Sequence, residues 1–325
     1  MAVRRIGRDG FADAAVAGRA DRNNAALAQI AKLVDWSRIE GLLSGLVKPE
    51  SRGEAAYPPL VLFKALLLQR WHGLSDPQLE AALSDRLSFL KFCGLSLEDR
   101  TPDHATLWRF RQKLAKARLD EALLAELDGQ LQAAGAVVKS GTLVDATLVR
   151  SAARRPKSPE GSKARSPADP EADFGRGGLR SGFVFGYKLH AAVDQGSRLI
   201  RRLALTPASR QEVSIAPNLL EPGDGRVFAD RGYDSQKLRD LLAALGLGDG
   251  LMRRARSNRP LPEADAARNL EIIPLRRPVE AVFGTLKRTY RLARMTAFSQ
   301  ARNRTNLNLA AFAYNLRRWR TLARA

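Results

Sequence analysis

The feature that most constrains the fold is a change of residue pattern at Gly135. Before this residue, apolar side chains recur at a spacing of three and four, which predicts amphipathic helices. After it, short β-branched and apolar runs are separated by turn residues, which predicts strands. The length of 325 residues suggests two or three domains. We therefore predict a flexible basic N-terminus, an all-helical domain and a domain built on a β-sheet, over residues 1–20, 21–136 and 137–325 respectively.

The elements predicted after Gly135 come in an order that specifies a topology. Strands are predicted over residues 141–149, 183–193, 198–206, 225–230 and 250–254. Helices are predicted over residues 211–220, 236–245 and 275–288. The second and third strands form a hairpin and the later strands follow helical crossovers, so the sheet is mixed and has helices on its faces. This α+β or α/β arrangement has the element order of a ribonuclease H-like fold.

The basic composition points to a polyanionic partner. A net charge of +20 at pH 7 and a pI near 10.9 favour nucleic acid, although a protein can also be merely basic. The single cysteine, Cys93, excludes an intrachain disulfide. The sequence contains no recognisable signal peptide and no apolar run long enough to span a bilayer. We therefore expect a cytoplasmic protein that does not enter a membrane.

Two aspartates stand on predicted strands that this fold brings together. Asp145 interrupts the first strand, and Asp230 ends the fourth. A lone carboxylate in a buried strand costs free energy unless it is paired or binds a cation. In a ribonuclease H-like sheet these two positions lie side by side. The structural alternative for Asp145 is a turn cap or an ion pair with an arginine.

Glu280 is a lone acid among basic residues in the predicted helix over residues 275–288. Arg276 lies four residues before it and Lys287 seven residues after it, on the same face of a helix. One interpretation is a surface ion pair between Arg276 and Glu280. The other is a third carboxylate that joins the two aspartates, since a late helix can supply one in this fold.

Three converging carboxylates repel one another unless they share divalent cations, and Mg²⁺ prefers such oxygen ligands. Two ions about 3.5–4 Å apart activate the attacking oxygen and stabilise the leaving oxygen of an in-line phosphoryl transfer. Under this interpretation Arg276 and Lys287 bind the DNA backbone beside the carboxylates.

In the helical half, the predicted helix over residues 105–116 is basic. Arg109, Arg111 and Lys113 lie off its apolar stripe. Short helices followed by a basic amphipathic helix favour a helix-turn-helix DNA-binding unit. The alternative is a solvated basic face.

Two other segments carry predictions. Residues 152–181 are basic and have no apolar face, so we predict a flexible insert that either clamps a nucleic-acid backbone or is a solvated linker. The amphipathic helix over residues 303–320 is expected to pack mainly against the sheet, with DNA contact or dimerisation as the alternative.

Several short motifs together resemble the DDE transposases of bacterial insertion sequences, of the insertion-sequence-five type. The resemblance runs from about Tyr57 to Trp319, and its order and spacing are more specific than any single motif. In the sheet half, the third motif keeps the family's gaps of three and six residues between Arg276, Glu280 and Lys287. The other stretches that carry it are Tyr57–Pro59, Thr101–Arg111, Val144–Thr147 and Phe228–Ser235.

The resemblance implies that Asp145, Asp230 and Glu280 are the catalytic and metal-binding residues, with two Mg²⁺ or Mn²⁺ ions as cofactors. It implies cleavage of double-stranded DNA at the inverted-repeat ends of an insertion sequence, followed by strand transfer of the released 3′-hydroxyl into target DNA. The helical domain would bind the ends. The active complex would be a homodimer or larger, acting in the bacterial cytoplasm and nucleoid.

The sequence departs from the family pattern in two places. Ile273 stands where the third motif usually has tyrosine, and residues 207–212 lack the Asn and His-Asp often seen there. Two other functions therefore stay open. One is a non-catalytic, sequence-specific DNA-binding protein derived from a transposase, and the other is a nuclease that hydrolyses DNA without joining it.

Overall fold

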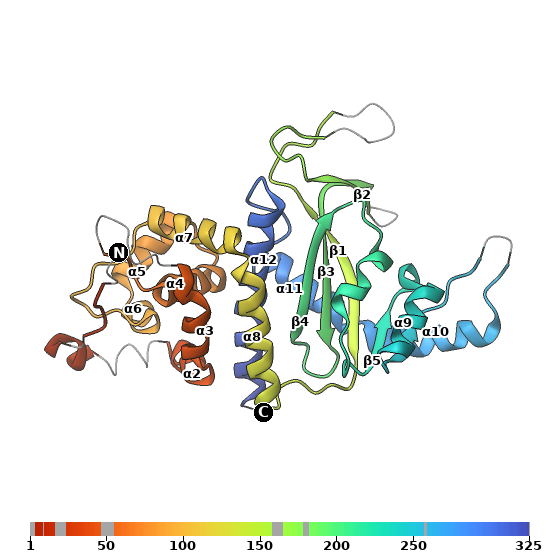
Figure 1. The fold of residues 1–325 in the computed structure, drawn as a ribbon, viewed down its shortest axis with the longest axis horizontal. Helices are drawn as coiled ribbons and strands as arrows, with labels where there is room; N and C mark the ends of the chain where they lie inside the picture. The colour runs from red at the N-terminus through yellow and green to blue at the C-terminus, as the bar shows by residue number, and fades with distance from the viewer. Residues whose placement is uncertain are drawn as a thin grey trace. The chain divides into compact units, whose positions relative to one another are not determined.

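The computed structural model describes residues 4–8, 10–16, 24–46, 55–157, 165–177, 182–256 and 259–324. The chain divides into two compact units (Figure 1). The helical unit comprises residues 1–130 and 305–325, and the sheet unit comprises residues 131–304. Within the described ranges, no helix is both long and apolar enough to cross a lipid bilayer.

The helical unit is organised around α4, which is buried on every face. Its helices are α2 (Ala25–Leu33), α3 (Trp36–Leu43), α4 (Pro59–His72), α5 (Asp76–Asp85), α6 (Leu87–Cys93), α7 (His104–Ala117) and most of α8 (Leu119–Ala133) and α12 (Gln300–Leu322), with a 3₁₀ turn η1 (Ser44–Leu46). Pro59 stands in the first turn of α4, and Gly73, with φ of 61°, ends it. Nine of the 14 residues of α4 are buried, so it needs helical partners all round.

The C-terminal helix differs from the prediction, because residues 305–325 cluster with the N-terminal helices rather than with the sheet. The ring of Phe312 lies edge-on to that of Phe63, with centroids 5.1 Å apart. Trp71 Nε1 donates a hydrogen bond to the carbonyl oxygen of Ala313 at 2.7 Å. An apolar stripe shows that a helix needs a partner but does not identify it. Here α4 supplies the partner surface.

The described residues of the sheet unit form a mixed sheet. Its strands are β1 (Thr142–Arg150), β2 (Asp173–Arg176), β3 (Phe183–Asp194), β4 (Ile200–Pro207), β5 (Arg226–Ala229) and β6 (Gly248–Leu251). β1 pairs antiparallel with β3 on one side and parallel with β5 on the other, and β6 continues parallel to β5. β2 and β4 pair antiparallel with successive stretches of β3. A hairpin followed by parallel crossovers is the predicted order, so the ribonuclease H-like fold class is confirmed.

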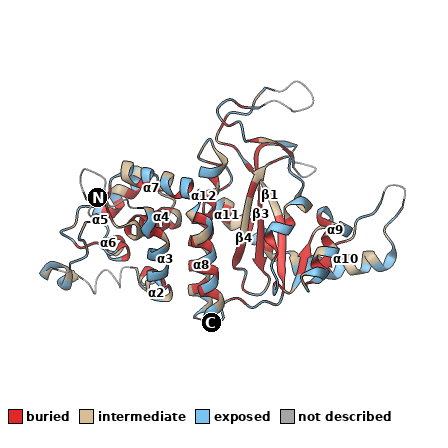
Figure 2. Ribbon diagram, in the orientation of Figure 1, coloured by how far each residue is buried: buried red, intermediate tan, exposed pale blue. Residues whose placement is uncertain are grey.

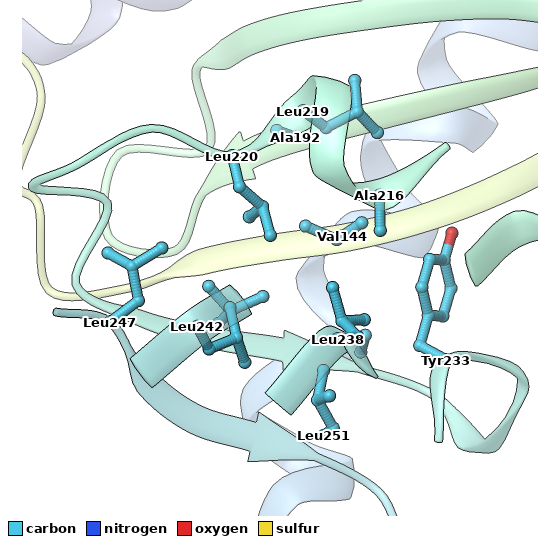
Figure 3. Packing of buried hydrophobic residues seen from close by; sticks show 12 residues of the cluster. Val144, Ala192, Ala216, Leu219, Leu220, Tyr233, Leu238, Leu242, Leu247 and Leu251 are labelled. Atoms are coloured by element: carbon cyan, nitrogen blue, oxygen red, sulfur yellow. The ribbon is translucent and has the colours of Figure 1, made fainter. Parts of the chain in front are cut away.

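The two faces of this sheet are covered differently. The covering elements are the 3₁₀ turns η2 (Glu212–Ser214), η3 (Ala216–Leu219) and η4 (Arg231–Tyr233) and the helices α9 (Gln236–Ala244), α10 (Glu263–Arg276) and α11 (Pro278–Arg288). Val144 packs in an apolar cluster with η3 and with Leu238 and Leu242 of α9 (Figure 3). Its neighbours Asp145 and Thr147 bond to α10 and α11, which places these helices on the opposite face. Strands β1 and β3 lie largely buried between the two layers (Figure 2).

The predicted helix over residues 211–220 is instead two 3₁₀ turns, η2 and η3. Pro217 explains the difference, since it has no amide hydrogen for the helical bond to residue 213. The irregular backbone places Glu212 beside η4.

The segment over residues 152–181, predicted as a flexible insert, is ordered in part. It contains β2, and Asp169 accepts hydrogen bonds from Ser151 Oγ and Tyr187 Oη, both at 2.5 Å. Asp169 is fully buried. Residues 158–164 and 178–181 of the predicted insert lie outside the described residues, as do residues 1–3, 9 and 17–20 of the predicted flexible N-terminus. Arg4 in that N-terminus donates to the carbonyl oxygen of Ala55 at 2.7 Å.

Candidate active site

Asp145 lies within β1 with 9% of its surface exposed, on the face opposite the apolar cluster. Its Oδ1 accepts a hydrogen bond from the amide of Ala146 at 2.8 Å. Its Oδ2 accepts one from Arg276 Nη2, also at 2.8 Å. Asp145 is therefore paired with an arginine, which is the structural alternative that the sequence offered for this residue.

Asp230 is the first residue after β5 and the N-cap of η4, where its Oδ1 accepts a hydrogen bond from the amide of Gly232 at 2.8 Å. Leu143 of β1 is paired with Phe228 of β5 in parallel register. Continued by two residues, this register sets Asp145 level with Asp230, which lies one residue beyond β5. The negative charge of Asp230 acts on Asp145, which agrees with a position near it.

The electrostatics of Asp145 reflect this crowding. The pKa of Asp145 is raised to about 6, mainly by burial and to a smaller extent by the negative charges of Asp230 and Glu212. The guanidinium of Arg276 and the amide of Ala146 act in the opposite direction. The side chain is thus a carboxylate whose ionised form is short of compensating positive charge.

Glu280 reaches this face through a break between two helices. The sequence predicted a single helix, but α10 ends at Arg276 and α11 begins at Pro278, whose ring cannot continue a hydrogen-bond ladder. Arg276 Nη1 lies 3.3 Å from Glu280 Oε1, so its guanidinium joins Glu280 to Asp145. The side chain of Glu280 is 56% exposed. The ion pair between Arg276 and Glu280 that the sequence suggested is present, and Arg276 also pairs with the buried Asp145.

Lys287 lies on α11 about two turns beyond Glu280. Its Nζ donates a hydrogen bond to Thr147 Oγ1 at 2.6 Å, two residues along β1 from Asp145. Burial lowers the pKa of Lys287. Both predicted backbone-binding cations, Arg276 and Lys287, thus lie on the Asp145 face of the sheet.

No three His, Cys, Asp or Glu side chains of the described ranges lie close enough together to hold a metal ion as they stand. Asp145 and Glu280 are bridged by the guanidinium of Arg276 instead. The chemistry of the site nevertheless fits a hard divalent cation, because its donors are carboxylate oxygens with a deficit of positive charge around Asp145. A buried hydroxyl without a hydrogen-bond partner, Tyr233 Oη, adds a further oxygen.

Sequence reasoning missed two residues here, Glu212 and Tyr233. Tyr233 was assigned only to a motif, and Glu212 only to a segment that departs from the family pattern. Both lie in 3₁₀ turns of three residues, which are too short to show a periodic pattern that would reveal the direction of a side chain. A glycine next to a tyrosine at a strand end is the weak signal that could have drawn attention to η4.

In the helical unit, the three basic residues predicted for DNA contact differ in their surroundings. Arg109 and Lys113 of α7 are exposed. With Arg4 and Tyr57, they line an open cavity of about 300 Å³. Arg111 is only 14% exposed in its side chain and pairs with Asp76 at 2.5 Å. α7 begins where Asp103 caps it, close to the predicted start.

Two family matches agree with this geometry. Residues 16–113 match a family described as Transposase domain (DUF772), and residues 137–316 match Transposase DDE domain. No solved structure matches the chain significantly. The second match covers the sheet unit and all three predicted carboxylates.

Proposed function

Because the chain belongs to the DDE transposase family, we propose that it cleaves DNA at the inverted-repeat ends of an insertion sequence and joins them to target DNA, with Asp145, Asp230 and Glu280 as its catalytic carboxylates. The observation that carries this proposal is the parallel pairing of Leu143 with Phe228, because Asp145 and Asp230 each follow two residues later. The spacing of Arg276, Glu280 and Lys287 on α10 and α11, which is that of the third motif of the family, also supports the proposal.

Asp145, Asp230 and Glu280 would hold two Mg²⁺ or Mn²⁺ ions, which supply activation of the attacking oxygen and stabilisation of the leaving oxygen. Burial keeps Asp145 poorly hydrated, so its ionised form gains more from a nearby cation than an exposed carboxylate does. Asp230 is held by the amide of Gly232, and this fixes the direction of its second oxygen.

Arg276 and Lys287 are proposed to bind the phosphates next to the scissile bond. Arg276 has a planar guanidinium, which suits two phosphate oxygens at once. Lys287 is held by Thr147, two residues from Asp145. Arg276 balances the charges of Asp145 and Glu280 in this structure. If cations balanced those charges instead, the guanidinium of Arg276 would be free to contact the DNA backbone.

The helical unit is proposed to bind the element ends through α7, with the helices before it completing a helix-turn-helix-like arrangement. Arg109 and Lys113 are assigned to DNA, because both are exposed beside the basic cavity. Arg111 is assigned to the internal ion pair with Asp76. Since an element has two ends, we propose a homodimer or larger assembly on DNA.

The decisive experiment compares Asp145→Asn, Asp230→Asn and Glu280→Gln with the wild type on DNA that carries the cognate ends. Each variant is expected to lose Mg²⁺-dependent cleavage and strand transfer and to retain end binding. Asp240→Asn is the matched control, because Asp240 is an exposed carboxylate of α9 that accepts a hydrogen bond from Gln236. Near-normal cleavage by any of the three variants would refute the assignment of that carboxylate.

The products separate the remaining functions. Joined DNA supports transposition, and cleaved DNA without joining indicates a hydrolytic nuclease. End binding by a wild-type protein that never cleaves, with either Mg²⁺ or Mn²⁺, indicates a non-catalytic DNA-binding relative.

End recognition has its own test. Arg109→Ala and Lys113→Ala are each expected to weaken end binding and to reduce the salt slope of the affinity by about 1. Arg111→Ala is expected to lower stability instead, because it leaves Asp76 half-buried without its guanidinium. Unchanged affinity and salt slope in both of the first two variants would exclude α7 as the recognition helix.

A further inference from the structure

A fourth acidic residue, Glu212, lies against the turn that carries Asp230. It is half-buried in η2, directly after β4. A Cβ placed on Gly232 would lie 3.0 Å from Asp230 Oδ1 and 3.3 Å from Glu212 Oε2. The two carboxylate oxygens therefore flank the same glycine, and the absence of a side chain at Gly232 lets them approach it.

Lys188 orients this carboxylate. Lys188 Nζ lies 3.1 Å from Glu212 Oε1 and donates a hydrogen bond to the carbonyl oxygen of Arg210 at 2.8 Å. The side chain of Lys188 is 13% exposed, so the pair is largely shielded from water. Because Oε1 faces the lysine, Oε2 is the oxygen directed toward Gly232 and Asp230.

Tyr233 provides independent evidence that this space is built for a ligand. The residue is fully buried, and its hydroxyl has no hydrogen-bond partner among the described residues. Figure 3 shows its ring at the edge of the apolar cluster, with the hydroxyl directed away from Leu251. Burial raises the pKa of Tyr233, and the next causes are the negative charges of Glu212, Asp145 and Asp230. The charges of all three carboxylates therefore act on the hydroxyl, which forms no hydrogen bond with the residues that the structure describes.

A buried hydroxyl next to acidic groups is expected to have an oxygen or a cation-bound group as its partner. Glu280 is a weaker candidate for this part of the site, since it is exposed and bound to Arg276. The negative charge of Glu212 raises the pKa of Asp145, as the charge of Asp230 does, so both charges act on Asp145.

We propose that Glu212 is a further cation ligand of the active site, which adds a carboxylate oxygen beside Asp230 and is held in position by Lys188. The ligand class is a hard divalent cation, Mg²⁺ or Mn²⁺, for which carboxylates are the preferred donors. With a cation bound, the hydroxyl of Tyr233 would donate its hydrogen bond to an oxygen in the same space. The inference rests on the proposed function, because it adds a residue to the carboxylate site defined there.

The test measures Mn²⁺ binding to the full-length protein without DNA, by calorimetry and by the electron paramagnetic resonance signal of free Mn²⁺. Glu212→Gln is expected to raise the Kd by about tenfold or more. Glu221→Gln is the matched control, because Glu221 is also a carboxylate of the sheet unit in an ion pair with a basic side chain, here Arg202 at 2.8 Å. A Kd for Glu212→Gln within threefold of the wild type overturns the proposal.

The same assay separates this inference from the proposed function. If Asp145→Asn and Asp230→Asn lose Mn²⁺ binding but Glu212→Gln does not, only the role of Glu212 fails. If none of the three changes the Kd, the carboxylate site itself fails. Thermal unfolding of every variant shows whether it is folded.

Should Glu212→Gln unfold, Fe²⁺ with ascorbate is used on the wild-type protein, because the bound ion cuts the chain beside its ligands. Cleavage near residue 212 supports the proposal, and cleavage confined to the neighbourhoods of Asp145 and Asp230 overturns it. Lys188→Met is expected to weaken Mn²⁺ binding less than Glu212→Gln does, and Lys188→Arg to restore it. Equal binding by Lys188→Met and the wild type would remove the positioning role.

Discussion

The two faces of β1 differ in a way that separates stability from chemistry. Val144 faces an apolar cluster in which α9 and η3 contribute buried aliphatic side chains. Asp145, one residue later, faces α10 and α11, where the contacts to the strand include an arginine and a lysine hydrogen bond. The alternation of a β-strand thus gives adjacent residues opposite functions. Mutations on the Val144 face should therefore lower stability, and mutations on the Asp145 face should lower activity.

The largest expected effect is on the charged face. Asp230→Asn should reduce cleavage by at least about 10³-fold. Stability should change by no more than about 0.5 kcal/mol, because an amide oxygen can still accept the hydrogen bond from Gly232. Cleavage rates and thermal unfolding on the same preparation test this. Unfolding of the variant would mean that the two faces are not separable.

The matching change on the apolar face is Leu242→Ala in α9, where Leu242 is 1% exposed. Removing a buried leucine should lower the free energy of unfolding by about 2–5 kcal/mol. Cleavage per folded molecule at low temperature should stay within about threefold of the wild type, since the carboxylates are untouched. Urea titration gives the stability. A loss of activity that exceeds the loss of folded protein would contradict the comparison.

The pH dependence of stability should distinguish the faces as well. Burial raises the pKa of Asp145 from 3.8 to about 6. A raised pKa means that the folded state binds the proton more tightly, so this contribution to stability is fully present below pH 3.8 and is lost as the pH rises through about 6. Relative to Asp145→Asn, metal-free wild type should lose about 3 kcal/mol of stability over this window.

Urea titrations of both proteins across the window measure that difference. Val144→Ala is the control, because it should shift the stability by the same amount at every pH. A pH-independent difference between wild type and Asp145→Asn would show that the aspartate is not desolvated.

The smallest effect concerns Lys287. Lys287→Met should weaken DNA binding by the sheet unit severalfold and lower the salt slope by about 1 if Lys287 binds a phosphate. Lys237→Met is the matched control, because Lys237 is an exposed lysine of α9 on the other face. Binding isotherms at several salt concentrations decide the question. Equal slopes for the two variants would place the DNA path elsewhere.

The sequence alone predicted most of the residues on the charged face of β1. The β-branched, apolar run around Asp145 predicted the strand that holds it, β1. The fourth predicted strand ended at Asp230, which the structure places one residue beyond β5. The spacing of Arg276, Glu280 and Lys287 predicted that their side chains lie on the same face of a helix. These inferences succeed because strand and helix periods are local properties of the chain.

The rest depended on contacts that local patterns do not encode. The pairing of Arg276 with Asp145 joins positions 131 residues apart, and the local sequence around either residue does not indicate its partner. Arg111 lies next to Phe110 of the buried stripe, and the presence of Asp76 decides that it turns inward. Glu212 lies in irregular structure after Pro207. Pro217 could have warned against a continuous helix there.

The arrangement of β2 and β4 along β3 has a consequence for the behaviour of the protein at high concentration. β2 pairs with residues 183–186 and β4 with residues 187–193, so that, with β1 on its other side, β3 has few unpaired backbone groups. Unpaired strand edges are templates for self-association. The segment that holds β2 therefore caps a stretch of the longest strand that β4 does not reach. Deleting it should favour aggregation through edge-to-edge pairing, even in a chain whose net charge of +20 opposes it.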